Sequence, residues 1–112
     1  MAGRAISFPN AQPFDEGGIV LVPLAPVMSE ARVGYNYDER LQTVRVDTSE
    51  GQLELKIGNP YALLNGDRED LEAPAQVRDG VVFVPLHFLA LATGTRVVWV
   101  AATRTVAMHV LS

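Results

Sequence analysis

One stretch of this sequence occurs twice. Residues 18–24 read Gly-Ile-Val-Leu-Val-Pro-Leu, and residues 80–86 read Gly-Val-Val-Phe-Val-Pro-Leu. The register continues without a gap as far as residues 47 and 109. The identical pairs are Gly18/Gly80, Val20/Val82, Val22/Val84, Pro23/Pro85, Leu24/Leu86, Thr43/Thr105 and Val44/Val106. A unit of about 30 residues cannot bury its own apolar face, so we expect both copies to share one core, and a scaffold or binding module before an enzyme.

Composition places the chain among ordinary single-domain globular proteins. It has 112 residues, of which 48% are hydrophobic and 20% charged, and its net charge is −4. This acidic balance disfavours a nucleic-acid partner, which requires a basic surface. The absence of cysteine excludes disulfides and thiolate metal sites. No apolar run approaches the roughly 20 residues that span a bilayer. The first residues lack the apolar stretch of a secretory signal, so we expect either a cytoplasmic protein or a piece of a longer secreted chain.

Hydrophobic periodicity predicts the elements of the first copy. A strand over residues 19–22 is expected to end at Pro23. The next apolar residues recur at helical spacing and predict one face of a two-turn helix, formed by Leu24, Val27, Met28 and Ala31. Alternating residues 33–37 then predict a strand, residues 38–40 a turn, and residues 41–47 a returning strand.

The second copy repeats this order. Residues 81–84 predict a strand that Pro85 ends. The corresponding helix face consists of Leu86, Leu89, Ala90 and Thr93. Gly94 is well placed as the left-handed residue that closes this helix. Two further strands are predicted over residues 96–100 and 104–110.

The segment between the copies carries strand and turn signals of its own. Residues 52–57 alternate strictly between polar and apolar, which predicts a half-buried strand. The Asn65-Gly66 pair is a strong two-residue hairpin signal. Residues 67–75 are rich in acidic side chains and are expected to be exposed.

Together these elements predict an α+β fold, with a mostly antiparallel β-sheet and two short helices. Two pseudo-repeats, each strand-helix-strand-strand, are expected to share one core. Residues 1–17 are expected to form an N-terminal tail or edge segment, with one short strand over residues 5–8. Residues 18–112 would form a single domain. Its predicted parts are repeat 1 at 18–47, a central hairpin region at 48–79 and repeat 2 at 80–110.

The second copy and the middle segment also carry a family pattern. Its parts are Val-Pro-Leu-His-Phe-Leu-Ala at 84–90, Gly94, Val-Val-Trp at 97–99, Ala-Ala-Thr-Arg-Thr-Val at 101–106, Leu-Lys-Ile-Gly at 55–58 and Leu-Asn-Gly at 64–66. This pattern resembles the copper amine oxidase N-terminal-like domain, also called the stalk domain, over roughly residues 18–110. The resemblance implies a non-catalytic accessory module of bacterial envelope or secreted proteins, and therefore an extracytoplasmic location. A cytoplasmic location remains the alternative.

The second helix departs from the family pattern. Family members usually carry Arg after Pro-Leu and an acidic residue in mid-helix, whereas this chain has His87 and Leu91 there. Phe88 and Leu91 are therefore expected on the outer side of this helix. A helix that is apolar on both sides is either buried within the fold or meets a partner, and burial is the favoured alternative. Under the second alternative, Phe88 and Leu91 are candidate partner-binding residues.

The residues do not predict a metal or a cofactor. Tyr37 lies in Asn-Tyr-Asp, a context that resembles the one in which copper amine oxidases convert tyrosine to a quinone. That chemistry needs copper held by three imidazoles, and the chain has only His87 and His109. Tyr37 aligns with Trp99 in the repeat, so both are expected to be aromatic core anchors. The acidic side chains of residues 67–72 lack a glycine-kinked calcium loop and predict a solvated turn.

The sequence lacks the motifs that would indicate an enzyme, and two binding functions remain as hypotheses. The chain has no Gly-x-Ser-x-Gly turn and no glycine-rich phosphate loop, so we predict no enzyme. The first hypothesis is an accessory module for protein–protein or cell-envelope attachment, which includes self-association. Residues 52–57 and 104–110 are its candidate edge strands for strand addition. The alternative is a carbohydrate- or peptidoglycan-binding module, with Tyr61 as the candidate contact.

Overall fold

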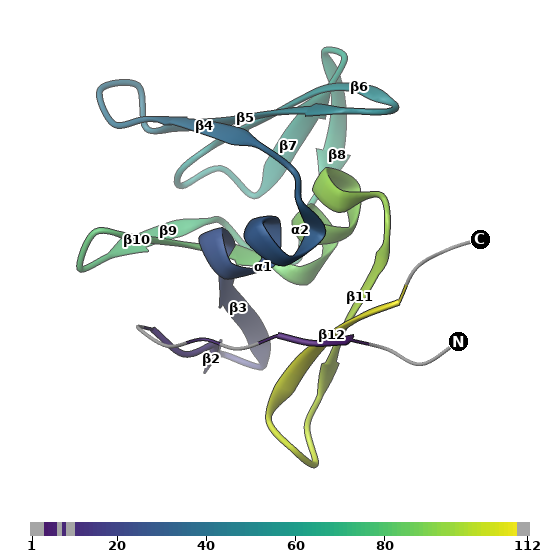
Figure 1. Ribbon diagram of the computed structural model, residues 1–112. Coiled ribbons are helices and arrows are strands. Elements are labelled where there is room, and N and C mark those ends of the chain that lie inside the picture. Colours follow the sequence, from purple (N-terminus) through teal and green to yellow (C-terminus); the bar gives the residue numbers. More distant parts are fainter. Residues whose placement is uncertain (1–3, 7, 9–10, 110–112) are drawn as a thin grey trace.

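The computed structural model describes residues 4–6, 8 and 11–109, with residues 4, 5 and 109 described by their backbone alone. In this part of the chain, three antiparallel sheets surround two short helices (Figure 1). The predicted α+β class, with mostly antiparallel strands and two helices, is confirmed. That the two runs are copies of one unit stays a prediction, and so do the predicted domain boundaries.

Each of the three sheets contains at least one hairpin of two strands that are consecutive in the sequence. The three-stranded sheet has the order β1 (Arg4–Ala5), β12 (Thr105–His109), β11 (Arg96–Val100). The four-stranded sheet has the order β2 (Phe14–Glu16), β3 (Ile19–Pro23), β10 (Val81–Pro85), β9 (Gln76–Arg78). The five-stranded sheet has the order β4 (Tyr35–Asp38), β5 (Thr43–Thr48), β6 (Gly51–Lys56), β7 (Tyr61–Leu64), β8 (Asp67–Asp70). The helices are α1 (Leu24–Ala31) and α2 (Leu86–Thr93).

The pair β3–β10 joins the two sequence copies at the middle of the four-stranded sheet. In its register Val22 lies opposite Val84, and Phe83 lies opposite Pro23. Each strand ends at its proline, as predicted, but includes that proline and is therefore one residue longer than expected. Proline lacks only the N–H donor. With φ −57° and ψ 130°, Pro23 keeps an extended backbone at the last position of the strand and directly precedes α1.

The predicted Asn65-Gly66 hairpin is present between β7 and β8. Both residues have positive φ angles, 53° and 86°, as the tight turns that match strand twist require. The Asn65 side chain also accepts a hydrogen bond from the Gln52 N–H at 3.1 Å and donates one to the Glu50 carbonyl at 2.9 Å. A Cβ at Gly51 would overlap the Asn65 amide. This contact ties the β7–β8 turn to the β5–β6 turn.

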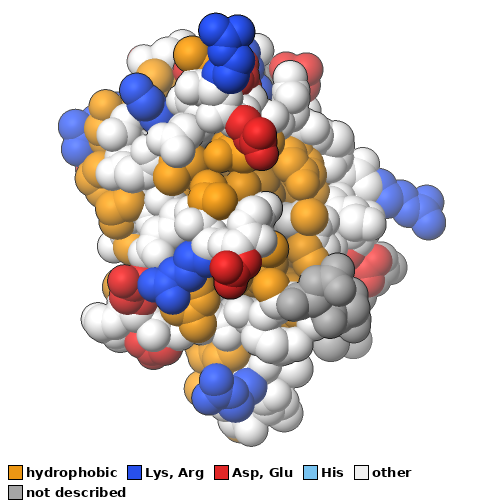
Figure 2. Space-filling model, turned by 90° about the vertical axis from the view of Figure 1, so that its left-hand side faces the viewer, with side chains coloured by type: hydrophobic (Ala, Val, Ile, Leu, Met, Phe, Trp, Pro, Cys, Tyr) orange, Lys and Arg blue, Asp and Glu red, His pale blue; other side chains and the backbone are white. Residues whose placement is uncertain are grey.

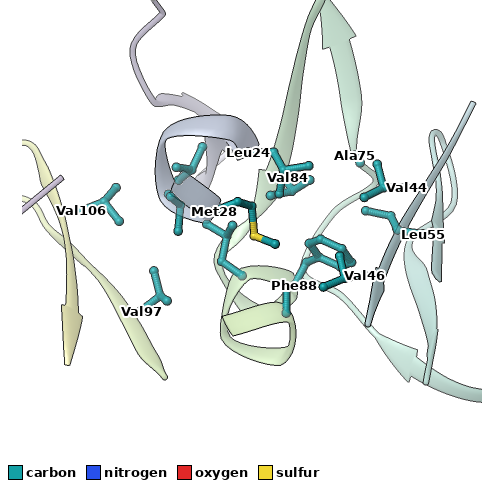
Figure 3. Packing of buried hydrophobic residues seen from close by; sticks show 14 of the residues in the cluster. Leu24, Met28, Val44, Val46, Leu55, Ala75, Val84, Phe88, Val97 and Val106 are labelled. Atoms are coloured by element: carbon teal, nitrogen blue, oxygen red, sulfur yellow. The ribbon is translucent and has the colours of Figure 1, made fainter. Parts of the chain in front are cut away.

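A single cluster of buried apolar side chains fills the space between the sheets. Val46 and Leu55 of the five-stranded sheet lie at one end of the cluster, and Val97 and Val106 of the three-stranded sheet lie at the other (Figure 3). Met28 of α1 lies between them. The two sequence copies therefore contribute to the same core.

The two helices bury different faces. The buried residues of α1 are Leu24, Val27 and Met28, as predicted. The buried residues of α2 are Phe88, Leu89 and Ala92, whereas Leu86, Ala90 and Thr93 are only half-buried. The predicted face of the second helix is thus right for Leu89, which is buried, and for Leu86, which packs against the core cluster, and wrong for Ala90 and Thr93. α2 contacts β5, β10 and β11, so it packs against one strand or more of each of the three sheets.

The segment before Gly18 is more than a tail. β1 pairs with β12, and β2 pairs with β3, each at the edge of its sheet. Ile6 and Phe8 are 7% and 8% exposed and belong to the core cluster. The predicted short edge strand is found at Arg4–Ala5, shorter and earlier than expected.

Candidate functional site

Phe88 is not available to a partner. Its side chain is 0% exposed and lies in the core beside Val46 of β5 (Figure 3). The outer side of α2, where the departures from the family pattern placed Phe88, faces the five-stranded sheet instead of solvent. Burial, the favoured alternative, is what the structure shows for this residue, and Phe88 leaves the set of candidate contact residues.

Leu91 and Tyr61 each have part of their surface covered by the protein itself. Leu91 is half-buried and lines a depression with residues 47–50 at the β5–β6 turn. Tyr61 is half-buried on β7, and the Arg68 guanidinium carbon lies 4.3 Å from the centre of its ring. This cation–π contact covers one face of the ring. The candidate residues therefore do not form one surface.

The structure shows where His87 and the acidic segment lie. His87 is exposed, and its backbone N–H donates to both Glu72 carboxylate oxygens at 3.3 Å. The side chain of His109 lies outside the described residues. Asp67–Asp70 forms strand β8 and not the predicted acidic turn. Within residues 4–6, 8 and 11–109, no group of three His, Asp or Glu side chains is placed to hold a metal ion.

The two aromatic anchors are partly buried. Tyr37 and Trp99 both pack against the core cluster, as expected from their equivalent positions in the sequence. Tyr35, on the same face of β4 as Tyr37, is 39% exposed. Among the described residues, no helix is long and apolar enough to cross a membrane.

The predicted edge strands are wrong. β6, at Gly51–Lys56, pairs with both β5 and β7, and β12, at Thr105–His109, pairs with both β1 and β11. β6 is interior because the strands directly before and after it both pair with it, and β12 is interior because β1, distant in the sequence, covers its second edge. The strands at the two edges of the three-stranded sheet are β1 and β11.

A groove of about 450 Å³ lies between β11 and α2. We call it the β11 groove. Residues 96–99 of β11 form one wall, and Leu86, His87 and Ala90 of α2 form the other, with Glu72 at the N-terminal end of the helix. Successive residues of a strand point to opposite faces of its sheet. Four consecutive residues therefore bring both faces of β11 to the groove, and no described residue of β12 lines it. The β11 groove therefore follows the free edge of β11.

Glu72 and Arg96, the two charged residues that line this groove, differ in their partners. The Glu72 carboxylate accepts from the N–H of His87 in the first turn of α2, where a negative charge is favourable. Arg96, at the start of β11, is exposed and makes no ion pair with any carboxylate among the described residues. One end of the groove thus offers an unpaired cation, while Leu86, Ala90 and Trp99 offer apolar surface.

A second apolar surface lies on another side of the molecule. Figure 2 shows hydrophobic side chains gathered at the middle of the face that carries the β4–β5 turn and the β9–β10 hairpin, with charged residues around them. Leu41 in the turn is 53% exposed and Val77 in β9 is 38% exposed. Apolar patches with a polar rim often mark interaction sites.

Comparison with known proteins gives one clear relationship. A search of curated proteins found none that matches this sequence. The family model of the copper amine oxidase N-terminal domain matches residues 1–108, nearly the whole chain. The resemblance carried by the Val-Pro-Leu helix starts, Gly94 and Trp99 is therefore confirmed, and the chain belongs to the copper amine oxidase N-terminal domain family.

Proposed function

We propose that this chain is a non-catalytic accessory module that attaches its parent protein to a protein partner. Membership of a non-catalytic stalk-domain family supports the accessory role. The observation that carries the binding role is the β11 groove, which combines an apolar wall with a strand edge and an Arg96 that have no partner among the described residues. Such grooves are a recurring way in which proteins bind extended segments of other proteins.

The use of polar side chains in the turns supports the same proposal. Asp15 accepts from the Gly18 N–H at 2.8 Å, and Asp38 accepts from the N–H groups of Arg40 and Leu41 at 2.9 and 3.1 Å. These carboxylates satisfy backbone donors that would otherwise be unpaired in tight turns. Their task is to hold the scaffold, which is what a stalk or attachment module requires.

An extracytoplasmic location at the bacterial cell envelope is part of this proposal. It rests on the family alone. The test is to locate the parent protein in cell fractions with an antibody to this domain. We expect it in the envelope or secreted fraction, and its presence only in the cytoplasm would contradict this part of the proposal.

A carbohydrate- or peptidoglycan-binding role is the second candidate. A depression of about 450 Å³ on the five-stranded sheet is lined by Asn36, Arg45, Asp47, Gln52 and Tyr35, and the Tyr35 side chain is 39% exposed. The four polar side chains can hydrogen-bond to a sugar, and Tyr35 is the aromatic residue among those that line the depression. Tyr61 has one ring face covered by Arg68, so Tyr35 is the better residue to test by substitution to Ala, with Tyr61→Ala as the comparison.

One binding experiment separates these two functions. The immobilised domain is exposed to an envelope extract, to the same extract after protease treatment, and to purified cell wall. Our proposal predicts retention of material from the untreated extract and its loss after protease. Protease-resistant retention of cell wall would favour the second candidate, and no retention in any arm would contradict both.

Self-association is a specific form of the proposed attachment. The exposed apolar side chains of Leu41 and Val77 support it, because a second copy could cover them. Light scattering over a range of concentrations tests it. We expect a dimer that Leu41→Asp weakens, whereas a strict monomer would remove this form of the proposal.

We also propose that the two sequence runs are copies of one unit. Val22 and Val84 correspond in the sequence and lie opposite each other in the β3–β10 pair. On either side of them, Leu21 lies opposite Pro85, and Phe83 lies opposite Pro23. This reciprocal register is what a local two-fold axis between two copies would produce.

A further inference from the structure

The free edge of β11 offers the groups that another strand would need. β11 pairs with β12 along one edge, and among the described residues no strand pairs with its other edge. Every second N–H and C=O along such an edge points away from the ladder and lacks a partner there. Because the β11 groove follows this edge, a chain that lies in it can hydrogen-bond to these groups. The three-stranded sheet would then become four-stranded.

The groove has room for only a short extended segment. Its volume of about 450 Å³ lies within the usual range of about 300–1,000 Å³ for binding pockets. Leu86 and Ala90 on the helix wall are half-buried and apolar. Side chains of an added strand that point toward α2 would meet this wall, so apolar side chains are favoured there.

At the end of the groove formed by Arg96, charge favours an acidic residue in the bound segment. Arg96 is exposed, is the first residue of β11 and has no ion-pair partner among the described residues. A residue opposite it on an added strand would lie within reach of its guanidinium, because directly opposite Cβ atoms are only about 5 Å apart. An acidic side chain is the complement of that cation. Glu72, near the start of α2, is already engaged with the His87 N–H.

We propose that the β11 groove binds an extended, acidic-apolar peptide segment of a partner protein as an added strand on β11. The segment carries an acidic residue opposite Arg96 and apolar residues at the alternate positions that face Leu86 and Ala90. This inference rests on the proposed function as a protein-binding module, and it names the site and the chemistry of the partner.

The probe is a phage-displayed library of random linear octapeptides, selected on the intact domain. We expect one enriched pattern, with alternating apolar residues and a single acidic residue. Synthetic peptides of that pattern should bind Arg96→Glu at least about tenfold more weakly, the loss of one charge-assisted contact. A second selection on Arg96→Glu should exchange the acidic residue for Lys or Arg. Methylation of peptide backbone nitrogens should also abolish binding, because strand addition depends on main-chain hydrogen bonds.

A second variant tests the groove from the helix side. Ala90→Tyr fills the groove without changing β11, and we expect it to weaken the same peptides by at least about tenfold. Arg40→Glu is the matched control for the charge change, because Arg40 is exposed in the β4–β5 turn. Ala25→Tyr is the matched control on an exposed position of α1. Both controls should bind within about twofold of the original domain.

The outcomes separate this inference from the proposed function. No enriched pattern, or peptides that bind the Arg96→Glu and Ala90→Tyr variants as well as the original domain, would overturn the inference. If the envelope extract still yields protease-sensitive retention that neither variant changes, the module binds protein elsewhere and only this inference falls. If the original domain retains nothing from that extract, the proposed function falls as well.

Discussion

The runs β3-α1-β4-β5 and β10-α2-β11-β12 have the same order of elements and different surroundings. In the first, β5 continues into β6 and becomes part of a five-stranded sheet. In the second, β12 is covered by β1, and β11 remains an edge strand beside α2. The depression beside β4 is lined by sheet residues such as Asn36 and Arg45, whereas the groove beside β11 has a helix as its second wall. Similar local sequences therefore yield a structural half and a half that we propose to bind a partner.

The two helices show why the halves differ. α2 contacts the five-stranded sheet through β5 and also contacts β10 and β11, so most of its side chains are apolar. α1 buries one stripe, and Ala25 and Ser29 on its other side are exposed. The apolar residue Leu91 in place of the family's mid-helix acidic residue, which stood out in the sequence, is consistent with this position of α2. The part of α2 that remains half-exposed, at Leu86 and Ala90, lines the β11 groove.

The central position of α2 predicts the largest effect on stability. Phe88→Ala removes a fully buried ring and should lower the free energy of unfolding by about 3–5 kcal/mol. Ser29→Ala on the exposed side of α1 should change it by less than about 0.5 kcal/mol. Urea unfolding followed by circular dichroism measures both. Equal small effects would show that α2 is not the centre of the core.

The helix ends predict changes of opposite sign. α1 is followed by Arg32 with φ 58°, and α2 by Gly94 with φ 68°. This left-handed region suits glycine and strains other residues. A Cβ at Gly94 meets no atom within 4 Å, so backbone strain is the only cost of Gly94→Ala.

We therefore expect Gly94→Ala to destabilise the domain, and Arg32→Gly to stabilise it, each by about 1 kcal/mol. The shift in thermal midpoint checks the sign of each change. If both substitutions destabilise the domain, the side chain of Arg32 contributes more than its backbone costs, and the comparison of the two helix ends fails.

The smallest expected effect concerns the helix starts. The first turn of α2 receives the Glu72 carboxylate, whereas α1 has no side-chain cap and no acidic residue in its first turn. Glu72→Gln keeps an acceptor oxygen but removes the charge, and should cost about 0.5 kcal/mol at low salt. The cost should shrink as salt is added, because Glu72 is exposed. A cost that does not change with salt would show that the helix dipole is not its origin.

Sequence reasoning was most successful where a local rule decides the structure. The Asn65-Gly66 turn, the left-handed residue Gly94 and the buried face of α1 all follow from a few neighbouring residues. The buried face of α2 does not, because contacts with the distant strand β5 draw Phe88 inward. The core positions of Ile6 and Phe8 were also missed, since no periodicity marks so short a segment.

The β11 groove could not be predicted from the sequence for a related reason. Its residues come from a loop, a helix and a strand, and no spacing rule joins Glu72 to Ala90 and Trp99. Edge strands are equally hidden, because no local pattern shows whether a strand pairs on both of its edges. Thus residues 52–57 and 104–110 looked like edges and are interior. His87 and Trp99 were singled out individually, but only the fold places them beside one groove.

Amide hydrogen exchange of the domain with and without a selected peptide tests the central claim most directly. If a partner segment adds to the free edge, outward-pointing amides within Arg96–Val100 should gain protection, while those of β4, the corresponding edge strand of the first run, should not change. Protection that appears along β4, or anywhere else without a change in β11, would contradict the claim that the second half of this molecule is the half that binds.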